Sequence, residues 1–359
     1  MGKDKPVISV AIVSMNGEKW IKKLLESIMD ALVFINTDRW EILLIDNASS
    51  DMSPDIFRLQ FEGDSRGKLI RNEKNIGWSP AVNQAFELSQ GDFIFILSND
   101  MEIHENSIKC IINLFEKDSK IGIVQFNSIS IYDKITQDSG RNYIDRFGFL
   151  YGYKASEFPE YVGVSEGMAF AVSRDLLVAG VKMDDTFFMM YDDADFSYRA
   201  RMMAFKVVFD PNSIVYHYRG GTVGNNAKVI NPLLARNGTR NHLTFILKCY
   251  ELKNVLITFP IAFFVLFTES ILFLRIDHAK FKTNIRALFE VFLRLKETIN
   301  QRREVQNSRK VSDYELLMLT HKFRPGSIIK NSSFMSNEYK GKVVNDERVD
   351  LIGKIDVHV

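Results

Sequence analysis

Three acidic segments of the chain have residue types that suit the binding of a cation or the movement of a proton. They are Asp46–Asp51, Ser98–Glu102 and Tyr191–Arg199, and each follows a run rich in apolar residues. Carboxylates at strand ends suit a divalent cation with a phosphate, because Mg²⁺ takes one or two carboxylates and leaves positions for substrate oxygens. The structural alternative for the first two segments is a turn with a helix cap, which uses the same residue types.

The third segment concentrates negative charge. Asp192, Asp193 and Asp195 place three carboxylates within four residues, directly after a mostly apolar stretch. We therefore expect these carboxylates to enter a cleft, where partial desolvation raises a carboxyl pKa and suits a general base. A helix N-terminus also tolerates acidic residues. Asp195 lies four residues before Arg199, the spacing of a structural ion pair on a helix.

Two further motifs could carry chemistry. His217 follows an apolar run and precedes the Gly- and Asn-rich segment 219–231, which we expect to form a loop that closes over a ligand. Such a histidine is a candidate metal ligand, although a single histidine is more often structural. Gly163–Gly167 matches the G-x-S-x-G elbow of hydrolases, with Ser165 as the nucleophile. That elbow requires a following helix, whereas Met168–Val172 has the pattern of a strand, so a serine hydrolase is disfavoured.

The elements that must position these residues alternate along the first half of the chain. Strands are expected at Val7–Val13, Glu41–Ile45, Lys68–Arg71, Phe93–Leu97 and Ile121–Phe126, and helices at Glu18–Phe34, Pro80–Leu88 and Asn106–Phe115. This alternation predicts an α/β fold with a mostly parallel sheet covered by helices on both faces. Ligands of such sheets bind at the carboxyl ends of the strands, where the first two acidic segments fall.

The second half of the sequence is less regular. We expect irregular strands and loops from 129 to 172, a helix at Ala194–Met203, and strands at Lys206–Phe209 and Ile214–Tyr216.

Composition excludes several functions. The 359 residues are 46% apolar and 25% charged, which is typical of a globular chain. Since 46 basic residues balance 45 acidic ones, we expect no nucleic-acid partner. The two cysteines cannot form a disulfide framework and indicate a reducing compartment. The G-x-G-x-x-G and P-loop patterns are absent, which disfavours a dinucleotide fold and a P-loop NTPase.

The last third of the chain has a different character. Residues 255–274 are mostly apolar and long enough to span a bilayer, but Pro260 and Glu269 interrupt them. An amphipathic stripe follows at 281–299, and residues 275–310 hold ten basic and four acidic residues, a local net charge of +6. Basic residues beside apolar ones favour the cytoplasmic leaflet. We therefore expect helices lying in the plane of a membrane surface; the alternative is a helical subdomain or a homodimer interface.

Five motifs occur together in a recognisable order. They are the first strand, Asp46–Ser49, Asn75–Trp78 with Asn83, Ser98–Asp100, and the block from Asp184 to His217. Together they resemble the family 2 glycosyltransferases, especially the rhamnosyltransferase-like branch, over about residues 7–250. The resemblance implies a GT-A fold, a nucleotide-diphosphate sugar as the donor, and inversion at the anomeric carbon.

The resemblance also implies residue roles. Asp193 matches the catalytic base, and Asp100 and His217 match ligands of a divalent cation, Mg²⁺ or Mn²⁺, on the donor diphosphate. Donor contacts are expected from Val13, Asp46 (to the nucleotide base), Asn75, Gly77, Ser98 and Asp100, and acceptor contacts from Glu166, Gly167 and Asp192. Ser98 departs from the family, because it stands in the place of the first aspartate of the Asp-x-Asp motif.

The sequence thus predicts an inverting, metal-dependent glycosyltransferase on the cytoplasmic face of a membrane, acting on a glycan or a lipid-linked acceptor. Its expected regions are the glycosyltransferase domain 1–243, apolar and amphipathic helices 244–310, and a polar tail 311–359. One alternative is a non-catalytic nucleotide-sugar-binding scaffold of the same fold, which Ser98 would support. Another is a processive polysaccharide synthase, but its Gln-x-x-Arg-Trp motif is not evident.

Overall fold

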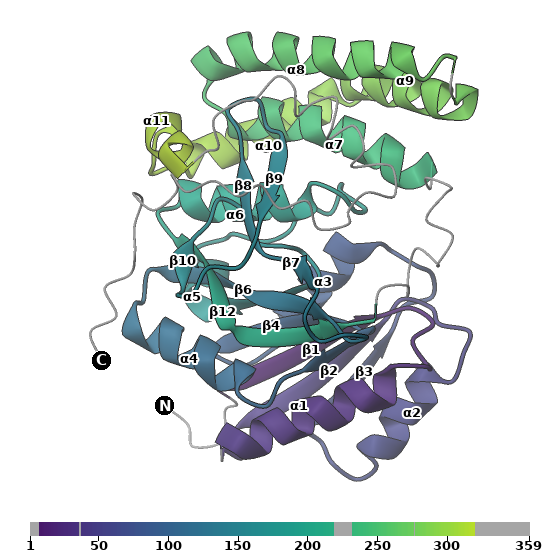
Figure 1. The fold of residues 1–359 in the computed structure, drawn as a ribbon, viewed down its shortest axis with the longest axis vertical. Helices are drawn as coiled ribbons and strands as arrows, with labels where there is room; N and C mark the ends of the chain where they lie inside the picture. Colours follow the sequence, from purple (N-terminus) through teal and green to yellow (C-terminus); the bar gives the residue numbers. More distant parts are fainter. Residues whose placement is uncertain (1–6, 36, 219–231, 276, 320–359) are drawn as a thin grey trace.

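The computed structural model describes residues 7–35, 37–218, 232–275 and 277–319. A central sheet lies between two layers of helices, and a further group of helices covers one end of the molecule (Figure 1). The predicted loop 219–231 and the tail beyond residue 319 lie outside the described residues.

The main sheet has the strand order β10-β12-β6-β11-β4-β1-β2-β3. Its strands are β1 (Ile8–Ser14), β2 (Trp40–Asp46), β3 (Gly67–Arg71), β4 (Phe93–Ser98), β6 (Ile121–Ser130), β10 (Glu160–Tyr161), β11 (Ala169–Ser173) and β12 (Lys206–His217). Two short strands, β5 (Met101–Ile103) and β7 (Gln137–Ser139), pair with β12 and β6. The strands β1 to β4 pair in parallel, as the alternation of apolar runs with helices predicts.

Two features of the sheet differ from the prediction. β11 lies between β4 and β6 and pairs antiparallel with both, so the sheet is mixed on this side. The two short strands predicted at 206–209 and 214–216 form one strand, β12, because its pairing with β6 continues across an irregularity between Phe209 and Ile214.

Helices cover both faces of the sheet. One face is covered by α1 (Ile21–Ile35), α2 (Ser53–Gln60) and α4 (Ser107–Lys117), and the other by α3 (Trp78–Leu88), α5 (Arg174–Val178) and α6 (Asp192–Met202). The strands are almost fully buried between these two layers, which explains why they are continuous apolar runs. The predicted α/β class is confirmed.

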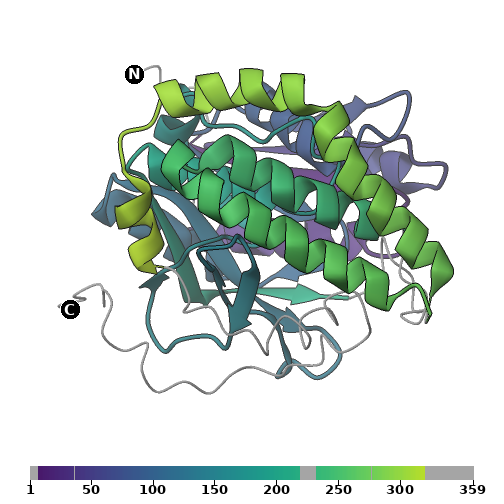
Figure 2. The same cartoon turned by 90° about the horizontal axis from the view of Figure 1, so that it is seen from above.

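The remaining helices form a group at one end of the molecule (Figure 1). They are α7 (Pro232–Cys249), α8 (Leu252–Leu272), α9 (His278–Leu293), α10 (Leu295–Asn307) and α11 (Asp313–Leu316), followed by a short 3₁₀ turn at Leu317–Leu319. Helices α7, α8 and α9 contact one another and lie over the sheet (Figure 2). A hairpin of β8 (Arg141–Ile144) and β9 (Leu150–Tyr153) rises from the sheet toward them (Figure 1).

This group shares a hydrophobic core with the rest of the chain. Buried side chains of α6, such as Tyr198, belong to the same hydrophobic cluster as Phe245 of α7, Leu266 of α8 and Val291 of α9. Residue 243, the predicted end of the first region, lies inside α7. The predicted stripe 281–299 is divided between α9 and α10, which meet at Arg294.

Candidate active site

A cavity of about 880 Å³ begins at the carboxyl ends of β1 and β4 and extends to α7 and α8. Ten of the predicted site residues line it: Val13, Asn75, Gly77, Ser98, Asp100, Glu166, Gly167, Asp192, Asp193 and His217. Residues that lie more than 200 positions apart in the sequence thus meet in one space. The position of the cavity agrees with the rule that ligands of α/β sheets bind beyond the strand ends.

Asp46 is the predicted residue that does not line this cavity. Its side chain has no exposed surface, and its carboxylate accepts hydrogen bonds from the backbone N–H of Ser49 at 3.3 Å and from Nε of Arg71 at 3.1 Å. Asn47 takes its place in the cavity wall. A direct contact of Asp46 with a nucleotide base therefore stays a prediction.

The turn at Asn75–Trp78 packs against the loop before α6 and is hydrogen-bonded to it. Gly77 has φ of 95°, and a Cβ at this position would lie 2.6 Å from the ring of Phe188, so only glycine fits. The side-chain oxygen of Asn75 accepts a hydrogen bond from the Gly77 N–H at 2.9 Å, and the Trp78 N–H donates to the Phe188 carbonyl at 3.0 Å. The turn and this loop therefore hold their positions together.

A histidine between two carboxylates lies at the sheet end of the cavity. Nε2 of His217 is 3.3 Å from Oδ2 of Asp100, and Nδ1 is 3.0 Å from Oδ2 of Asp138. Burial lowers the pKa of His217, but the hydrogen bonds and charges of the two carboxylates outweigh it and raise the pKa to about 9. Ser98 donates its hydroxyl to Oδ1 of Asp100 at 2.7 Å, so this serine orients the carboxylate.

The chemistry of this group fits a divalent cation. Asp100 and His217 offer an oxygen and a nitrogen ligand, and Asp138 accepts from the second ring nitrogen, the arrangement that orients metal-bound histidines. Within the described ranges, no cluster of three His, Cys, Asp or Glu side chains could hold a metal ion by itself. Two protein ligands still suit Mg²⁺ or Mn²⁺, because substrate phosphates and water complete their coordination.

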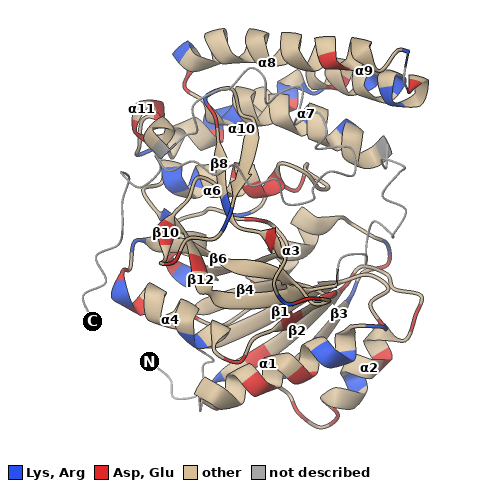
Figure 3. Cartoon of the chain, in the orientation of Figure 1, with Lys and Arg blue, Asp and Glu red and all other residues tan. Residues whose placement is uncertain are grey.

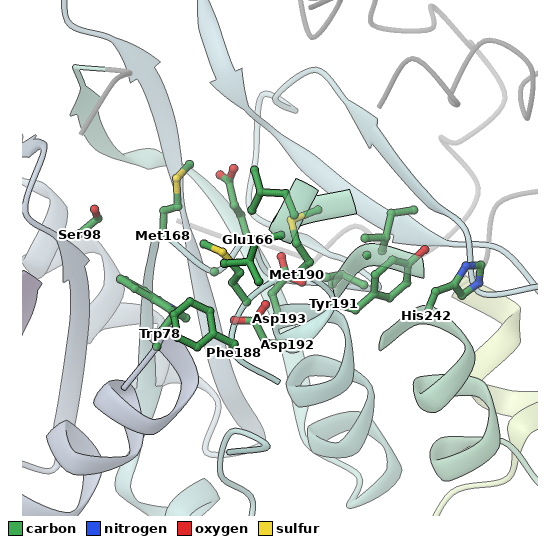
Figure 4. A pocket seen from close by; sticks show the side chains of 18 of the residues that line it. Trp78, Ser98, Glu166, Met168, Phe188, Met190, Tyr191, Asp192, Asp193 and His242 are labelled. Carbon is green, nitrogen blue, oxygen red and sulfur yellow. The ribbon is translucent and has the colours of Figure 1, made fainter. Parts of the chain in front are cut away.

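Asp192 and Asp193 begin α6 and lie at the centre of the cavity, near Glu166 (Figure 4). Asp193 accepts a hydrogen bond from the Ala194 N–H at 2.7 Å. Burial raises the pKa of both carboxyls, and the charge of Asp193 raises that of Asp192 further. A carboxyl with a raised pKa inside a cavity has the property that a general base requires.

The backbone directly before Asp192 and Asp193 is strained. Met190 and Tyr191 both have left-handed conformations, with φ of 71° and 63°, which non-glycine residues rarely adopt. Asn241 of α7 holds this segment by donating to the carbonyls of Met189 and Met190 at 3.1 and 2.8 Å. His242 stacks on the Tyr191 ring at 4.8 Å. Helix α7 therefore fixes the start of α6.

Glu166 and Gly167 complete the centre of the cavity. Burial raises the pKa of Glu166 to about 7, although a hydrogen bond from Ser139 and the charge of His217 oppose the shift. A Cβ on Gly167 would lie 3.3 Å from Cβ of Asp193, so glycine leaves room beside the carboxylate. Glu166 therefore stands at the same site as Asp193, as predicted.

The hydrolase motif does not form a nucleophile elbow. Ser165 is buried, and its hydroxyl donates to the Glu166 carbonyl at 3.4 Å. The residues after Gly167 enter strand β11 rather than a helix. The structural context that this motif needs is therefore missing.

Sequence reasoning missed Asp138 and His242 and gave Asn241 no role in the site; all three support the site rather than form its centre. Asp138 lies on the short strand β7, in a segment without a regular pattern, and its pairing with His217 depends on tertiary structure. Asn241 and His242 lie within the long helix α7, and no sequence pattern there indicates contact with the start of α6.

Residues 9–177 match the family model described as Glycosyl transferase family 2. This part, just under half of the chain, resembles a family 2 glycosyl transferase domain. It contains the Asn75–Trp78 turn, Asp100 and Glu166, whereas Asp193 and His217 lie beyond the matched residues. The match supports the predicted family, and the rhamnosyltransferase-like branch stays a prediction.

Curated relatives are similar over part of the chain. The glycosyltransferase GlyG of Streptococcus pneumoniae is 24% identical over 228 residues, which cover 60% of this chain and 72% of GlyG. The beta-monoglucosyldiacylglycerol synthase of Trichormus variabilis is 29% identical over 122 residues, 33% of this chain and 25% of that protein. Three other curated glycosyltransferases are similar over 27% of this chain, and the matched part covers 27 to 36% of their own length. The chain therefore spans about a third of those proteins.

Solved structures share the fold. Staphylococcus aureus TarS 1-349 in complex with UDP-GlcNAc has a TM-score of 0.54 at 14% identity, and the match covers 92% of this chain and 93% of TarS 1-349. GalNAc-T7 with UDP, GalNAc and Mn²⁺ has a TM-score of 0.57 at 18% identity, over 74% of this chain and 51% of that one. The central sheet with its flanking helices therefore has a GT-A-like fold.

Proposed function

We propose that this chain transfers a sugar from a nucleotide-diphosphate donor to a hydroxyl of an acceptor, with inversion at the anomeric carbon. The observation that carries the proposal is that one cavity contains both the Asp100–His217 pair and the carboxyl of Asp193, whose pKa burial raises. The first could hold the donor diphosphate and the second could accept a proton. Structures of the same fold with bound UDP or UDP-GlcNAc support the choice of donor class.

On the donor side, the sheet edge binds and orients the nucleotide diphosphate. Val13 and Asn75 lie in the wall where the nucleotide would rest, and Asp100 and His217 would hold a divalent cation beside the diphosphate. When bound, this cation neutralises the charge that grows on the leaving diphosphate. Ser98 keeps Asp100 in one orientation, and Asp138 does the same for His217.

On the acceptor side, Asp193 takes the proton of the attacking hydroxyl. A positioned base of this kind contributes about 10²–10⁴-fold to the rate. Asp192 and Glu166 line the same part of the cavity, where they could orient the acceptor sugar by accepting hydrogen bonds from its hydroxyls. Alignment of the hydroxyl with the anomeric carbon, opposite the leaving group, supplies further acceleration.

A panel of nucleotide sugars tests this function. We expect one donor, with Mn²⁺ or Mg²⁺, to raise the melting temperature of the full chain, because a ligand that binds the native state stabilises it. The same donor should be hydrolysed slowly without an acceptor, with release of the nucleoside diphosphate. Donor binding without any hydrolysis or transfer would favour the non-catalytic scaffold, and full activity in metal-free buffer would contradict the role of Asp100 and His217.

We also propose that α8 and α9 attach the enzyme to the cytoplasmic surface of a membrane. Among the described residues, α8 is a helix long and apolar enough to cross a bilayer, by length and composition alone. Much of its surface is exposed and apolar, and it carries few charged residues (Figure 3). The basic residues of α9 and α10 favour an in-plane position at an anionic surface. The alternative is that the same face joins two copies of the chain.

A further inference from the structure

The cavity changes character along its length. Its sheet end is lined by polar side chains such as Asn16, Asn47 and Ser98, whereas beyond Asp193 it continues between the β8–β9 hairpin, α7 and α8. Figure 4 shows this progression from Ser98, past Glu166 and Asp193, to Tyr191 and His242. We call the part beyond Asp193 the helix-side arm; it is lined by Phe149, Leu150, Met190, Leu233, Leu234 and Leu266.

Apart from Thr239 of α7 and a polar far end formed by Glu269, Lys280 and Asn284, the helix-side arm offers few hydrogen bonds to a bare saccharide. Tyr191 uses its hydroxyl to donate to the Gly148 carbonyl at 3.1 Å, and Nε2 of His242 is bound to the Phe147 carbonyl at 2.8 Å. A sugar hydroxyl placed against these apolar walls would lose its bonds to water without replacement. An apolar chain would gain there, because its burial is favourable and needs no polar partner.

The far end of the arm lies against the helices proposed to contact a membrane. Leu266 and Glu269 of α8 and Lys280 of α9 line it, and the opposite charges of Glu269 and Lys280 attract each other. The outer faces of the same helices expose Leu256 and Phe289, at 69% and 66%. The arm therefore connects the catalytic carboxylate with the layer of the molecule that is apolar on its outside.

We propose that the helix-side arm holds the apolar chain of an amphiphilic acceptor, so that the acceptor is a lipid-linked or lipid-anchored hydroxyl compound rather than a free saccharide. This inference rests on the proposed glycosyl transfer. The chain would lie between α7 and the hairpin, and the hydroxyl to be glycosylated would stand beside Asp193. The donor would occupy only the polar sheet end.

Gly238 of α7 provides a means to close the arm. It lines the cavity, and a Cβ at this position would meet only Cε of Met190, at 4.0 Å. Gly238→Ala therefore leaves the arm open, whereas Gly238→Phe fills it. Leu234→Trp fills it from a second position on the same helix. Leu256→Phe is the matched control, because it adds an aromatic ring on the exposed side of α8.

The experiment measures binding of n-alkyl β-D-glucosides with hexyl to decyl chains, below micelle formation, to the full chain by titration calorimetry. We expect the affinity of the unaltered protein to rise about fourfold for each added methylene. Gly238→Ala and Leu256→Phe should keep this dependence, and Gly238→Phe and Leu234→Trp should lose it. A flat chain-length series in the unaltered protein, or an unchanged slope in both plugged variants, would overturn the proposal.

Binding of UDP and GDP with Mn²⁺ to the same samples separates the two proposals. All variants that bind a nucleotide like the unaltered protein are folded at the donor site, so a lost chain-length dependence in them reports the arm alone. Chain-length dependence in a protein that binds no nucleotide and hydrolyses no nucleotide sugar would contradict the glycosyltransferase proposal but leave the apolar arm in place.

Discussion

At the residue scale, Asp193 combines a buried carboxyl with a position at the centre of the cavity. We predict that Asp193→Asn lowers turnover by two to four orders of magnitude, because the acceptor hydroxyl loses its base. Donor binding should remain, since Asp193 lies away from Asp100 and the sheet end. Single-turnover transfer and donor titration measure the two effects, and near-normal turnover would contradict the assignment.

The same substitution tests the pKa of Asp193. Burial raises this pKa above its unfolded value of about 3.9, so ionisation of Asp193 reduces stability as the pH rises through its folded pKa. Asparagine carries no such penalty. Asp193→Asn should therefore melt at a higher temperature than the unaltered protein at pH 8, and the difference should shrink at pH 4. If the variant and the unaltered protein melt at the same temperature at pH 8 as well as at pH 4, Asp193 lies in a more solvated environment.

Asp138 should matter for the cation although it does not bind it. Its carboxylate holds Nδ1 of His217 at 3.0 Å, and loss of such a partner typically costs 10–100-fold in metal affinity. We predict this loss for Asp138→Asn in a Mn²⁺ titration with nucleotide present. Asp133→Asn is the control, because Asp133 is exposed and bonds only to its own turn. Equal Mn²⁺ affinities of the two variants would exclude this role.

These residues also mark what sequence could and could not predict of the site. Asp100, Asp193 and His217 stand in motifs whose order along the chain is distinctive, so the sequence alone brought them together. Asp138, Asn241 and His242 contribute through contacts with distant segments, and no local spacing encodes those contacts. Asp46 differs, because the resemblance implies a contact with the nucleotide base, whereas its buried carboxylate accepts hydrogen bonds from Ser49 and Arg71; the base contact stays a prediction.

At the element scale, a buried ion network attaches α6 to α7. Lys248 is 1% exposed and contacts the carboxylates of Asp184 and Asp195, the latter at 2.7 Å. Arg199 pairs with Asp195 on the same helix, also at 2.7 Å, as the i,i+4 spacing predicts. Burial raises the pKa of Asp184, but the charge of Lys248 and its hydrogen bond prevail and lower the pKa to about 2.

We predict that Lys248→Met destabilises the fold by about 3–5 kcal/mol at pH 7, because it leaves the Asp184 carboxylate buried without its cation and leaves Asp195 with Arg199 alone. The difference should shrink as the pH falls from 5 toward 2, where protonation removes the favourable pairing of Asp184 in the unaltered protein. Urea unfolding of the variant and the unaltered protein at several pH values measures this difference in stability. Lys22→Met is the control: the Lys22–Glu26 pair is exposed, so its loss should lower the free energy of unfolding by less than about 1 kcal/mol. Equal losses of stability in the two variants would mean that the Lys248 network is solvated.

The elements that the sequence predicted well are those whose burial is uniform. β1, β2 and β4 are apolar along their whole length because both faces are covered, and α1 has its apolar side chains at helical spacing. Helix α2 was not predicted, since only eight residues form it and few of them are buried. The antiparallel direction of β11 could not be predicted either, because strand patterns carry no information on direction.

At the scale of the whole molecule, one surface stands out. Helices α8 and α9 expose a set of large apolar side chains: Leu252, Leu256, Ile257, Ile261, Phe264, Phe267, Ile271, Leu272, Phe289, Phe292 and Leu293. Contiguous exposed apolar surface of this kind marks a contact with a membrane or another protein. Truncation after α7 would not test its role, because α7, α8 and α9 share buried side chains with α6.

Substitutions on the exposed face alone give a sharper test. We predict that the full chain floats with anionic liposomes, and less with neutral ones, because the basic residues of α9 and α10 add to apolar contacts. Leu256→Ser, Phe264→Ser and Phe289→Ser together should abolish flotation without unfolding the protein, since these side chains are 69%, 66% and 66% exposed. Val33→Ser on α1, 74% exposed and distant from this face, is the control.

The oligomeric state of the same variants decides between the two uses of this face. A membrane contact predicts that the triple variant and the unaltered chain have the same mass by light scattering in detergent-free buffer wherever both are soluble. If the unaltered chain instead ignores liposomes, remains soluble, and forms a dimer that the triple variant cannot form, the face is a subunit interface. In that case the helix-side arm would end at a partner chain, and a long-chain acceptor would have no lipid layer from which to enter.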